Sequence, residues 1–360
     1  MFERAFIKKL AAVDALTPGS ILGDAVLSIS GKILLNRGIV VTERIISQLS
    51  AWDIKSVYIV DDTAEPEAEQ TAVQLITADR GVSDEYTRFL QEYDTVVTLI
   101  AQSFDFIRKR KIIPVNFFKD TSNNIANSIA TVSSALAHCL MVSDYKLADA
   151  LTRHSVMVAY LAGSIASHMQ WDEEAVKGVI MAGLLHDVGN VVLEKDKSYQ
   201  RHAHINEAAV LLRETPKITS EVILGVVQHH EFIDGSGIPT GALGMKIHPY
   251  ARVIAVADNF HSKAYVGEVA NPFTVLDVLA HEMFGRLDPS FCHVFISQVK
   301  DCLLNTKVLL NDGREAEVIF FHPTGSALPI VKTTAGDIID LATSSGVSLN
   351  RLLSPNEGLN

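Results

Sequence analysis

The stretch at residues 228–241 constrains what this chain can fold into more than any other part of it. Its sequence is Gln-His-His-Glu-Phe-Ile-Asp-Gly-Ser-Gly-Ile-Pro-Thr-Gly, and an apolar run at residues 222–227 leads directly into His229 and His230. Imidazoles that enter an apolar interior are costly unless they have a partner, and a metal ion is a common one. The stretch therefore predicts a buried metal site whose other ligands come from elsewhere in the chain.

Other histidines and aspartates on apolar runs are candidates for those ligands. His186 and Asp187 follow the apolar residues 179–185, and Asp258 follows another apolar run at 253–257. A single histidine on an apolar helix is more often a satisfied core residue. Several of them on successive helices, together with aspartates, favour a metal centre. The candidate ligands are His154, His186, Asp187, His204, His229, His230 and Asp258.

The donor types indicate which ions and which chemistry to expect. Imidazoles and carboxylates without a thiolate suit Fe, Mn or similar divalent ions better than a structural zinc site. Seven ligands exceed the needs of one tetrahedral site, so two ions are predicted. Neighbouring side chains on a helix, such as His186 and Asp187, point about 100° apart, so Asp187 could bridge both ions. Two such ions hydrolyse phosphodiesters well, because they activate water and stabilise the attacking and leaving oxygens.

Charge and composition exclude several classes of partner. The formal net charge of -11 argues against binding of nucleic acid polymers or anionic membranes, which requires a basic surface. The N-terminus does not resemble a signal peptide. We also find no apolar block of about 20 residues, which a membrane span would need. The three cysteines are odd in number and lack metal-site spacing, which is typical of a reducing compartment. We therefore expect a cytoplasmic protein.

Composition and periodicity divide the chain into five parts. Residues 1–62 are predicted to form a small α+β module, 63–83 an acidic linker and 84–143 a helical connector. Residues 144–305 show helix after helix with little β pattern, and 306–360 form a β-rich appendage. The predicted fold class is mainly α, with an all-helical core between the two smaller modules.

The flanking parts carry local signals but no catalytic chemistry. Short strands are expected at 25–29, 32–35 and 56–60, and a helix at 43–51 with Thr42 as its N-cap. This module either docks a signalling protein or simply packs on its neighbour.

Apolar residues of the predicted helix at 84–110 recur every three or four positions. This stripe either packs within the chain or forms a homodimer. A second helix is expected at 118–141. Near the C-terminus, strands at 307–310 and 317–321 flank an Asp-Gly turn, and a third strand is expected at 327–331.

The order and helical setting of the candidate ligands resemble the HD-GYP branch of the HD-domain metal-dependent phosphohydrolases. Residues 228–241 are similar to the HHExxDGxGYP signature of that branch, and the resemblance covers residues 150–298. It implies an all-helical HD-domain core with five core helices and a di-iron or di-manganese type site. It also implies a bacterial cyclic di-GMP phosphodiesterase that produces pGpG, GMP or both.

The resemblance also implies a role for each site residue. One ion would be held by His154, His186, Asp187 and Asp258. The other would be held by Asp187, His204, His229 and His230, with His202 a rival of His204. Asp187 and Asp234 are the catalytic candidates, and Glu231 is expected to support a ligating histidine. The candidate substrate contacts are Asn190, Gly235, Gly237, Ile238, Pro239, Arg252 and Lys263, with Arg201 as a further cation.

The chain departs from the family pattern at several positions. Asn190 stands where the HDxGK motif has lysine, and Ile238 stands where the signature has tyrosine. Ala150 replaces the glutamate of trinuclear members, which favours two ions, and a family arginine falls near Gly267. Because lysine and arginine contact substrate phosphates, we expect intact metal binding but weakened recognition of a cyclic dinucleotide. A signalling module without turnover and an HD hydrolase of another nucleotide phosphoester are the alternatives.

Overall fold

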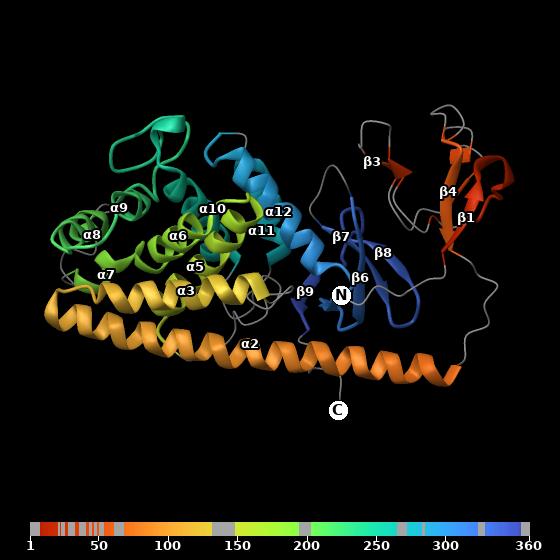
Figure 1. Cartoon of the computed structure of the whole chain (residues 1–360), viewed down its shortest axis with the longest axis horizontal. Helices are drawn as coiled ribbons and strands as arrows, with labels where there is room; N and C mark the ends of the chain where they lie inside the picture. Colours follow the sequence, from red (N-terminus) through yellow and green to blue (C-terminus); the bar gives the residue numbers. More distant parts are fainter. Residues whose placement is uncertain are drawn as a thin grey trace. The chain divides into compact units, whose positions relative to one another are not determined.

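The fold is mainly α, as predicted, with small sheets towards both ends of the chain (Figure 1). The computed structural model describes residues 8–20, 22, 26–27, 33–35, 41–42, 45–46, 49, 54–60, 68–131, 148–193, 203–264, 272–282, 285–322 and 328–353. The chain divides into two compact units, Met1–Gly81 and Val82–Asn360.

The N-terminal unit contains two small antiparallel sheets. In one, β1 (Lys8–Ala12) pairs with β4 (Ser56–Val60), and η1 (Val13–Ala15) follows β1. In the other, β2 (Val26–Leu27) pairs with β3 (Ile33–Leu35). Thr42 accepts a hydrogen bond from the backbone N–H of Ile45, as expected of an N-cap, although most of the predicted helix at 43–51 lies outside the described residues.

The helix α2 (Ala68–Arg110) corrects the predicted linker at 63–83. Residues 68–83 belong to this 43-residue helix, which begins 16 positions before the predicted start at 84. Residues 68–83 contain three alanines and two glutamines, which are strong helix formers, so the composition of this segment is compatible with a helix. The boundary between the two units therefore falls within a continuous helix.

The apolar stripe of α2 is buried within the C-terminal unit. Val97, Ile100 and Ile107 have no exposed surface, and Phe89 and Tyr93 contact the ring of Tyr160 at centroid distances of 5.8 and 5.9 Å. Packing inside one chain therefore accounts for the stripe without a second copy.

The rest of the helical core surrounds two central helices, α5 and α6. Nearly all side chains of α5 between residues 155 and 166 are buried, and a Cβ on Gly183 of α6 would lie 2.8 Å from the Cα of Ala159, so the two helices are in close contact. The helices are α3 (Val115–Thr131), α5 (Ala150–His168), α6 (Glu173–Leu185), α7 (Val188–Val192), α8 (Ala203–Arg213), α9 (Ser220–Val227), α10 (Pro249–Ala264), α11 (Pro272–Glu282) and α12 (Pro289–Leu303), with a short 3-10 helix η4 (Gly244–Lys246).

Capping residues fix where the central helices begin. The side chain of Asp149 accepts from the N–H of Thr152 at 3.0 Å and so starts α5 just before His154. Asp172 caps α6 in the same way through the N–H of Ala175 at 2.8 Å. Such caps satisfy backbone donors that the first turn leaves unpaired. Residues 173–192 are long and apolar enough to resemble a membrane span. However, 67% of an 18-residue stretch within them is buried inside the unit, and α6 ends at Leu185.

The C-terminal sheet has five antiparallel strands in the order β8-β7-β6-β5-β9. The predicted hairpin is present as β5 (Lys307–Leu310) and β6 (Glu315–Phe321), and β7 (Pro329–Thr333) corresponds to the predicted third strand. Two further strands, β8 (Ile338–Asp340) and β9 (Leu349–Leu352), were not predicted because they are short and lack an alternating apolar pattern.

The C-terminal end of α2 is attached to the end of α7. Lys111 follows α2 with a positive φ of 56°, and its Nζ donates to the carbonyl oxygen of Val192 at 2.9 Å. Val192 is the last residue of α7.

Candidate metal centre

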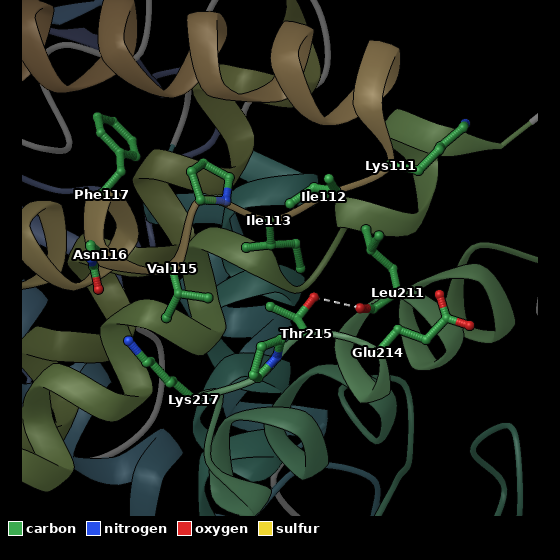
Figure 2. Close-up of a pocket in the computed structure, with 12 residues that line it drawn as sticks. Lys111, Ile112, Ile113, Val115, Asn116, Phe117, Leu211, Glu214, Thr215 and Lys217 are labelled. Carbon is green, nitrogen blue, oxygen red and sulfur yellow. Dashed lines mark hydrogen bonds between the residues drawn. The ribbon is translucent and has the colours of Figure 1, made fainter.

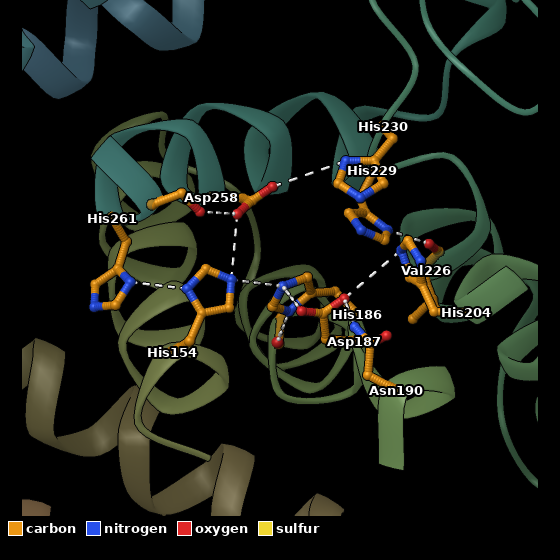
Figure 3. A network of polar contacts seen from close by, with 12 residues as sticks. His154, His186, Asp187, Asn190, His204, Val226, His229, His230, Asp258 and His261 are labelled. Carbon is orange, nitrogen blue, oxygen red and sulfur yellow. Dashed lines mark hydrogen bonds and ion pairs between the residues drawn. The ribbon is translucent and has the colours of Figure 1, made fainter. Parts of the chain in front are cut away.

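The candidate ligands come from several core helices and from the residues that follow α6 and α9, and they converge on one region (Figure 3). His186 and Asp187 occupy the junction between α6 and α7, where Asp187 leaves helical geometry with φ -103° and ψ 15°. His229 and His230 directly follow Gln228, which caps the end of α9. His154, His204 and Asp258 come from α5, α8 and α10.

One group of ligand atoms consists of His154, His186 and Asp258. The Nε2 atom of His154 lies 3.2 Å from Oδ1 of Asp258 and 3.1 Å from Nε2 of His186. Burial opposes protonation of His154, but the hydrogen bond with Asp258 and the charges of Asp258 and Asp187 together raise the pKa of this imidazole. Asp258 therefore stabilises a positive charge at this group, which is the kind of charge that a bound cation would supply.

A second group consists of His204, His229 and His230. The donor atoms of this group lie within 4.8 Å of one another, and the rings of His229 and His230 are 4.0 Å apart. His229 is 1% exposed, whereas the side chain of His230 is 34% exposed. The second group therefore has a buried side and a side that faces solvent.

Asp187 lies between the two groups. Its Oδ2 atom is 3.7 Å from Nε2 of His186, and its Oδ1 atom is 3.7 Å from Nε2 of His204. It also forms a third set of possible ligands with His186 and His229. One carboxylate with an oxygen towards each group has the placement that a bridging ligand needs.

The ionisation of these side chains suits divalent cations. Burial lowers the pKa of His186, His204 and His229, so each imidazole is neutral and keeps a lone pair. Burial alone would raise the pKa of Asp187 and Asp258, but the surrounding histidines lower both, so both carboxylates are charged. Neutral imidazoles and ionised carboxylates are the forms that bind metal.

The hydrogen bonds of the site also leave the correct atoms for metal binding. The Nδ1 atoms of His186 and His229 donate to the carbonyl oxygens of Gly183 and Val226 at 2.8 and 2.6 Å. Their Nε2 atoms therefore carry lone pairs. The Nε2 atoms of His204 and His229 are buried and have no hydrogen-bond partner among the residues that the structure describes, which is costly in the absence of an ion. The residues present fit two divalent ions.

Gly189 allows His204 to approach Asp187. A Cβ at this position would lie 1.7 Å from the carbonyl oxygen of His204, so only glycine permits this contact between α7 and α8. The structure thus brings His204 into the site, while its rival His202 lies outside the described residues, as do Arg201 and Gly267.

Glu231 has a different role from the one predicted. It is 2% exposed, and its carboxylate accepts from the N–H and hydroxyl of Thr240, both at 2.7 Å, and from the N–H of Ala242 at 3.1 Å. These contacts hold the loop that follows the histidine pair, and none of them involves a ligating histidine. The expected support of a histidine is therefore replaced by a clamp on this loop.

The loop itself folds back onto the histidine pair. The N–H of Ile238 donates to the carbonyl oxygen of His230 at 3.0 Å, and a Cβ on Gly237 would lie 2.2 Å from the nitrogen of Phe232. Gly235 has a φ of +78°, which favours glycine. Pro239 is exposed at the outer part of the loop.

Asp234 lies outside the groups of ligand atoms. It is exposed, and its Oδ1 atom accepts from the N–H and the hydroxyl of Ser236 at 2.9 and 2.6 Å. These hydrogen bonds lower the pKa of Asp234. They close a local turn, so they favour a role in loop shape over the predicted catalytic role.

Three of the candidate substrate contacts have partners within the protein. Arg252 is 8% exposed and forms a buried ion pair with Asp288, so it contradicts the prediction of a substrate contact. Lys263 lies 3.8 Å from Glu282. Asn190 is exposed, and its side-chain amide donates to Oδ1 of Asp187 at 2.9 Å, so it binds a ligand carboxylate.

His261 is a site residue that the sequence analysis missed. It lies on α10 three positions after Asp258, and its Nδ1 atom is 2.8 Å from Nδ1 of His154 (Figure 3). Burial and the neighbouring His154 lower its pKa to about 3. Its spacing from Asp258, which puts the two on one face of a helix, was the available signal.

A separate pocket lies between the segment after α2 and the turn after α8 (Figure 2). Its lining includes Ile112, Ile113, Leu211, Glu214 and Lys217, and none of the candidate metal ligands. The hydroxyl of Thr215 donates to the carbonyl oxygen of Leu211 at 2.7 Å within it.

Comparisons with known proteins concern the family and the fold of this chain. Residues 140–272 match the family described as HD domain. The chain is 29% identical over 160 residues to the 3'3'-cGAMP-specific phosphodiesterase 1 of Vibrio cholerae, which covers 40% of this chain and 37% of that protein. It is 26% identical over 247 residues to the cyclic di-GMP phosphodiesterase PA4108 of Pseudomonas aeruginosa, covering 65% of this chain and 59% of that protein. The chain thus spans about half the length of these curated relatives.

A solved structure shares the fold. Bd1817, an HDG"Y"P protein from Bdellovibrio bacteriovorus, is similar with a TM-score of 0.51 and 17% identity, covering 81% of this chain and 99% of that chain.

Proposed function

We propose that this chain, a member of the HD-GYP branch of the HD-domain family, is a bacterial phosphodiesterase that hydrolyses cyclic di-GMP at a two-metal centre. The products would be pGpG, GMP or both, and the ions Fe or Mn. We place this activity in the cytoplasm, with the N-terminal unit as the candidate docking site for a signalling protein.

One observation carries the proposal. Two adjacent groups of histidines flank Asp187, which directs one oxygen to each group, and within the described part of the chain the buried Nε2 atoms of His204 and His229 have no hydrogen-bond partner. A pair of divalent ions, when bound, supplies Lewis-acid activation of water and neutralises charge at phosphorus.

The chain's own residues position that chemistry. The carbonyl oxygens of Gly183 and Val226 orient the rings of His186 and His229, and Asn190 orients the carboxylate of Asp187. The exposed side of His230 marks where a phosphodiester would approach. Glu231 holds the loop that follows His230, and this loop would border a bound substrate near the exposed part of His230. The loop contains Asp234 and the candidate substrate contacts Gly235, Gly237, Ile238 and Pro239.

Two other functions have specific support. Among the described residues, Arg252 is paired with Asp288, and the neutral Asn190 stands where the family motif has a lysine, so few cations are placed to bind phosphates, which favours a signalling module with little turnover. The name of the Vibrio cholerae relative, which specifies 3'3'-cGAMP, favours a different cyclic dinucleotide as substrate.

Anaerobic turnover assays distinguish these functions. The protein is loaded with Fe(II) or Mn(II), its metal content is measured, and it is incubated separately with cyclic di-GMP and 3'3'-cGAMP. We expect about two ions per chain and formation of pGpG from cyclic di-GMP. Cleavage of 3'3'-cGAMP alone would change the substrate, and bound nucleotide without product would identify a signalling module.

A pair of variants tests the centre itself. Asp187→Ala should abolish both metal binding and turnover while the far-ultraviolet circular dichroism is unchanged. Asp301→Ala, at an exposed position on α12, is the matched control and should retain both. Unaltered activity of Asp187→Ala would refute the assignment of the site.

A further inference from the structure

The ligating histidines differ in what holds their second ring nitrogen. His186 and His229 each donate from Nδ1 to a backbone carbonyl oxygen three residues earlier. The Nδ1 atom of His154 instead faces the Nδ1 atom of His261, at 2.8 Å, with the ring centroids 4.9 Å apart. A side chain from α10 therefore does for His154 what the backbone does for the other two.

The tautomer of each ring follows from this contact. His154 presents Nε2 to Asp258 and His186, so a ligating lone pair must lie on Nε2 and the proton on Nδ1. That N–H can donate across 2.8 Å only if Nδ1 of His261 carries a lone pair. His261 must then carry its own proton on Nε2. In the opposite arrangement, a proton on Nδ1 of His261 would face the proton of His154.

We propose that His261 is a positioning residue that fixes the tautomer and ring orientation of His154 and thereby supports the ion held by His154, His186 and Asp258. The assignment rests on the proposed metal centre but not on the identity of its substrate. Partners of this kind typically change metal affinity by about 10- to 100-fold when removed. The effect should be confined to one ion, because His204, His229 and His230 form their own group.

His261 is placed to hold His154 and not to bind the same ion. Its Nδ1 atom is directed at Nδ1 of His154, on the opposite side of that ring from Nε2. Among the described residues, the groups whose donor atoms could share an ion do not include His261.

Two nearly isosteric substitutions separate hydrogen bonding from packing. His261→Leu fills the space but offers no acceptor. His261→Asn can place a side-chain oxygen near the position of Nδ1 and so restore the acceptor. His168→Leu is the matched control, because His168 is exposed at the end of α5, the helix that carries His154.

The readout is equilibrium binding of Mn(II) and Co(II) to the full-length metal-free protein, with Co(II) absorption spectra as a monitor of ligand geometry. We expect His261→Leu to weaken one of two ions by about tenfold or more. His261→Asn and His168→Leu should bind both ions as the unaltered protein does. Unfolding of each metal-free variant in urea reports any separate loss of packing.

Each other outcome has a defined meaning. Wild-type affinity in His261→Leu would overturn the proposal, and equal losses in the Leu and Asn variants would replace it with simple packing. Weakening of both ions would overturn the assignment to one group. An unaltered protein that binds two ions without cleaving cyclic di-GMP would refute the proposed substrate and leave this role of His261 in place, whereas one that binds no second ion would overturn both.

Discussion

Replacement of Gly189 by alanine tests how far the metal centre depends on the contact between α7 and α8. The new Cβ would lie 1.7 Å from the carbonyl oxygen of His204 and 2.8 Å from its Cα. Real Cβ atoms essentially never come within 3.0 Å of another group, so the backbones must separate by about 1.3 Å, the difference between 3.0 and 1.7 Å. Neither partner is a flexible side chain that could move aside.

Both stability and metal binding should decrease. In an unconstrained helix this substitution stabilises by roughly 0.5–1 kcal/mol. Here overpacking should cost about 1–3 kcal/mol or more, because the contact is with backbone. A metal–nitrogen bond tolerates about 0.2 Å, so a shift several times larger removes His204 as an effective ligand.

The measurements are urea unfolding of the metal-free protein and metal content after dialysis. We expect a lower free energy of unfolding and loss of the ion held by His204, His229 and His230. Gly285→Ala is the control, because a Cβ there would meet nothing within 4 Å. A Gly189→Ala protein with the stability and metal content of the unaltered protein would refute the role of this contact.

Three further predictions concern the loop, the buried ion pair and pH. Glu231→Gln should destabilise the fold by about 1–3 kcal/mol, because an amide cannot accept from Thr240 and Ala242 together; an unchanged urea midpoint would contradict the clamp. Arg252→Met should cost about 3–5 kcal/mol in unfolding free energy by leaving Asp288 buried and unpaired, and a loss of substrate affinity without a loss of stability would restore it as a substrate contact. The metal-free protein should lose stability as the pH falls below about 6.5, because the lowered pKa of His186, His204, His229 and His261 lets the unfolded chain bind protons that the folded chain does not. His154 has a raised pKa and opposes this loss of stability, but it is one group against these four. The loss of stability due to His261 continues towards its pKa of about 3. Urea midpoints that rise as the pH is lowered from 7 to 5 would contradict the prediction.

The ligand groups were predictable because their signal lies along the chain. An apolar run that ends in histidine or aspartate indicates a buried polar end, and this pattern preceded His186, His229 and Asp258. The structure brings these residues together as that pattern implies. The mainly α fold followed from the same periodicity.

Roles that depend on the path of a loop or on a distant partner were not predictable in this way. The carboxylate of Glu231 meets Thr240 and Ala242 only because the loop folds back at Gly237, which no periodicity signals. The partner of Arg252, Asp288, lies 36 positions along the chain.

The hydrogen bond from Lys111 to Val192 has a mechanical consequence for the metal centre. It joins the end of a 43-residue helix, about 65 Å long at 1.5 Å per residue, to a helix of only five residues. That short helix begins immediately after Asp187 and contains Asn190, which holds its carboxylate. A displacement of the end of α2 that pulls on this bond would therefore act on α7, which begins next to the carboxylate that lies between the two metal groups.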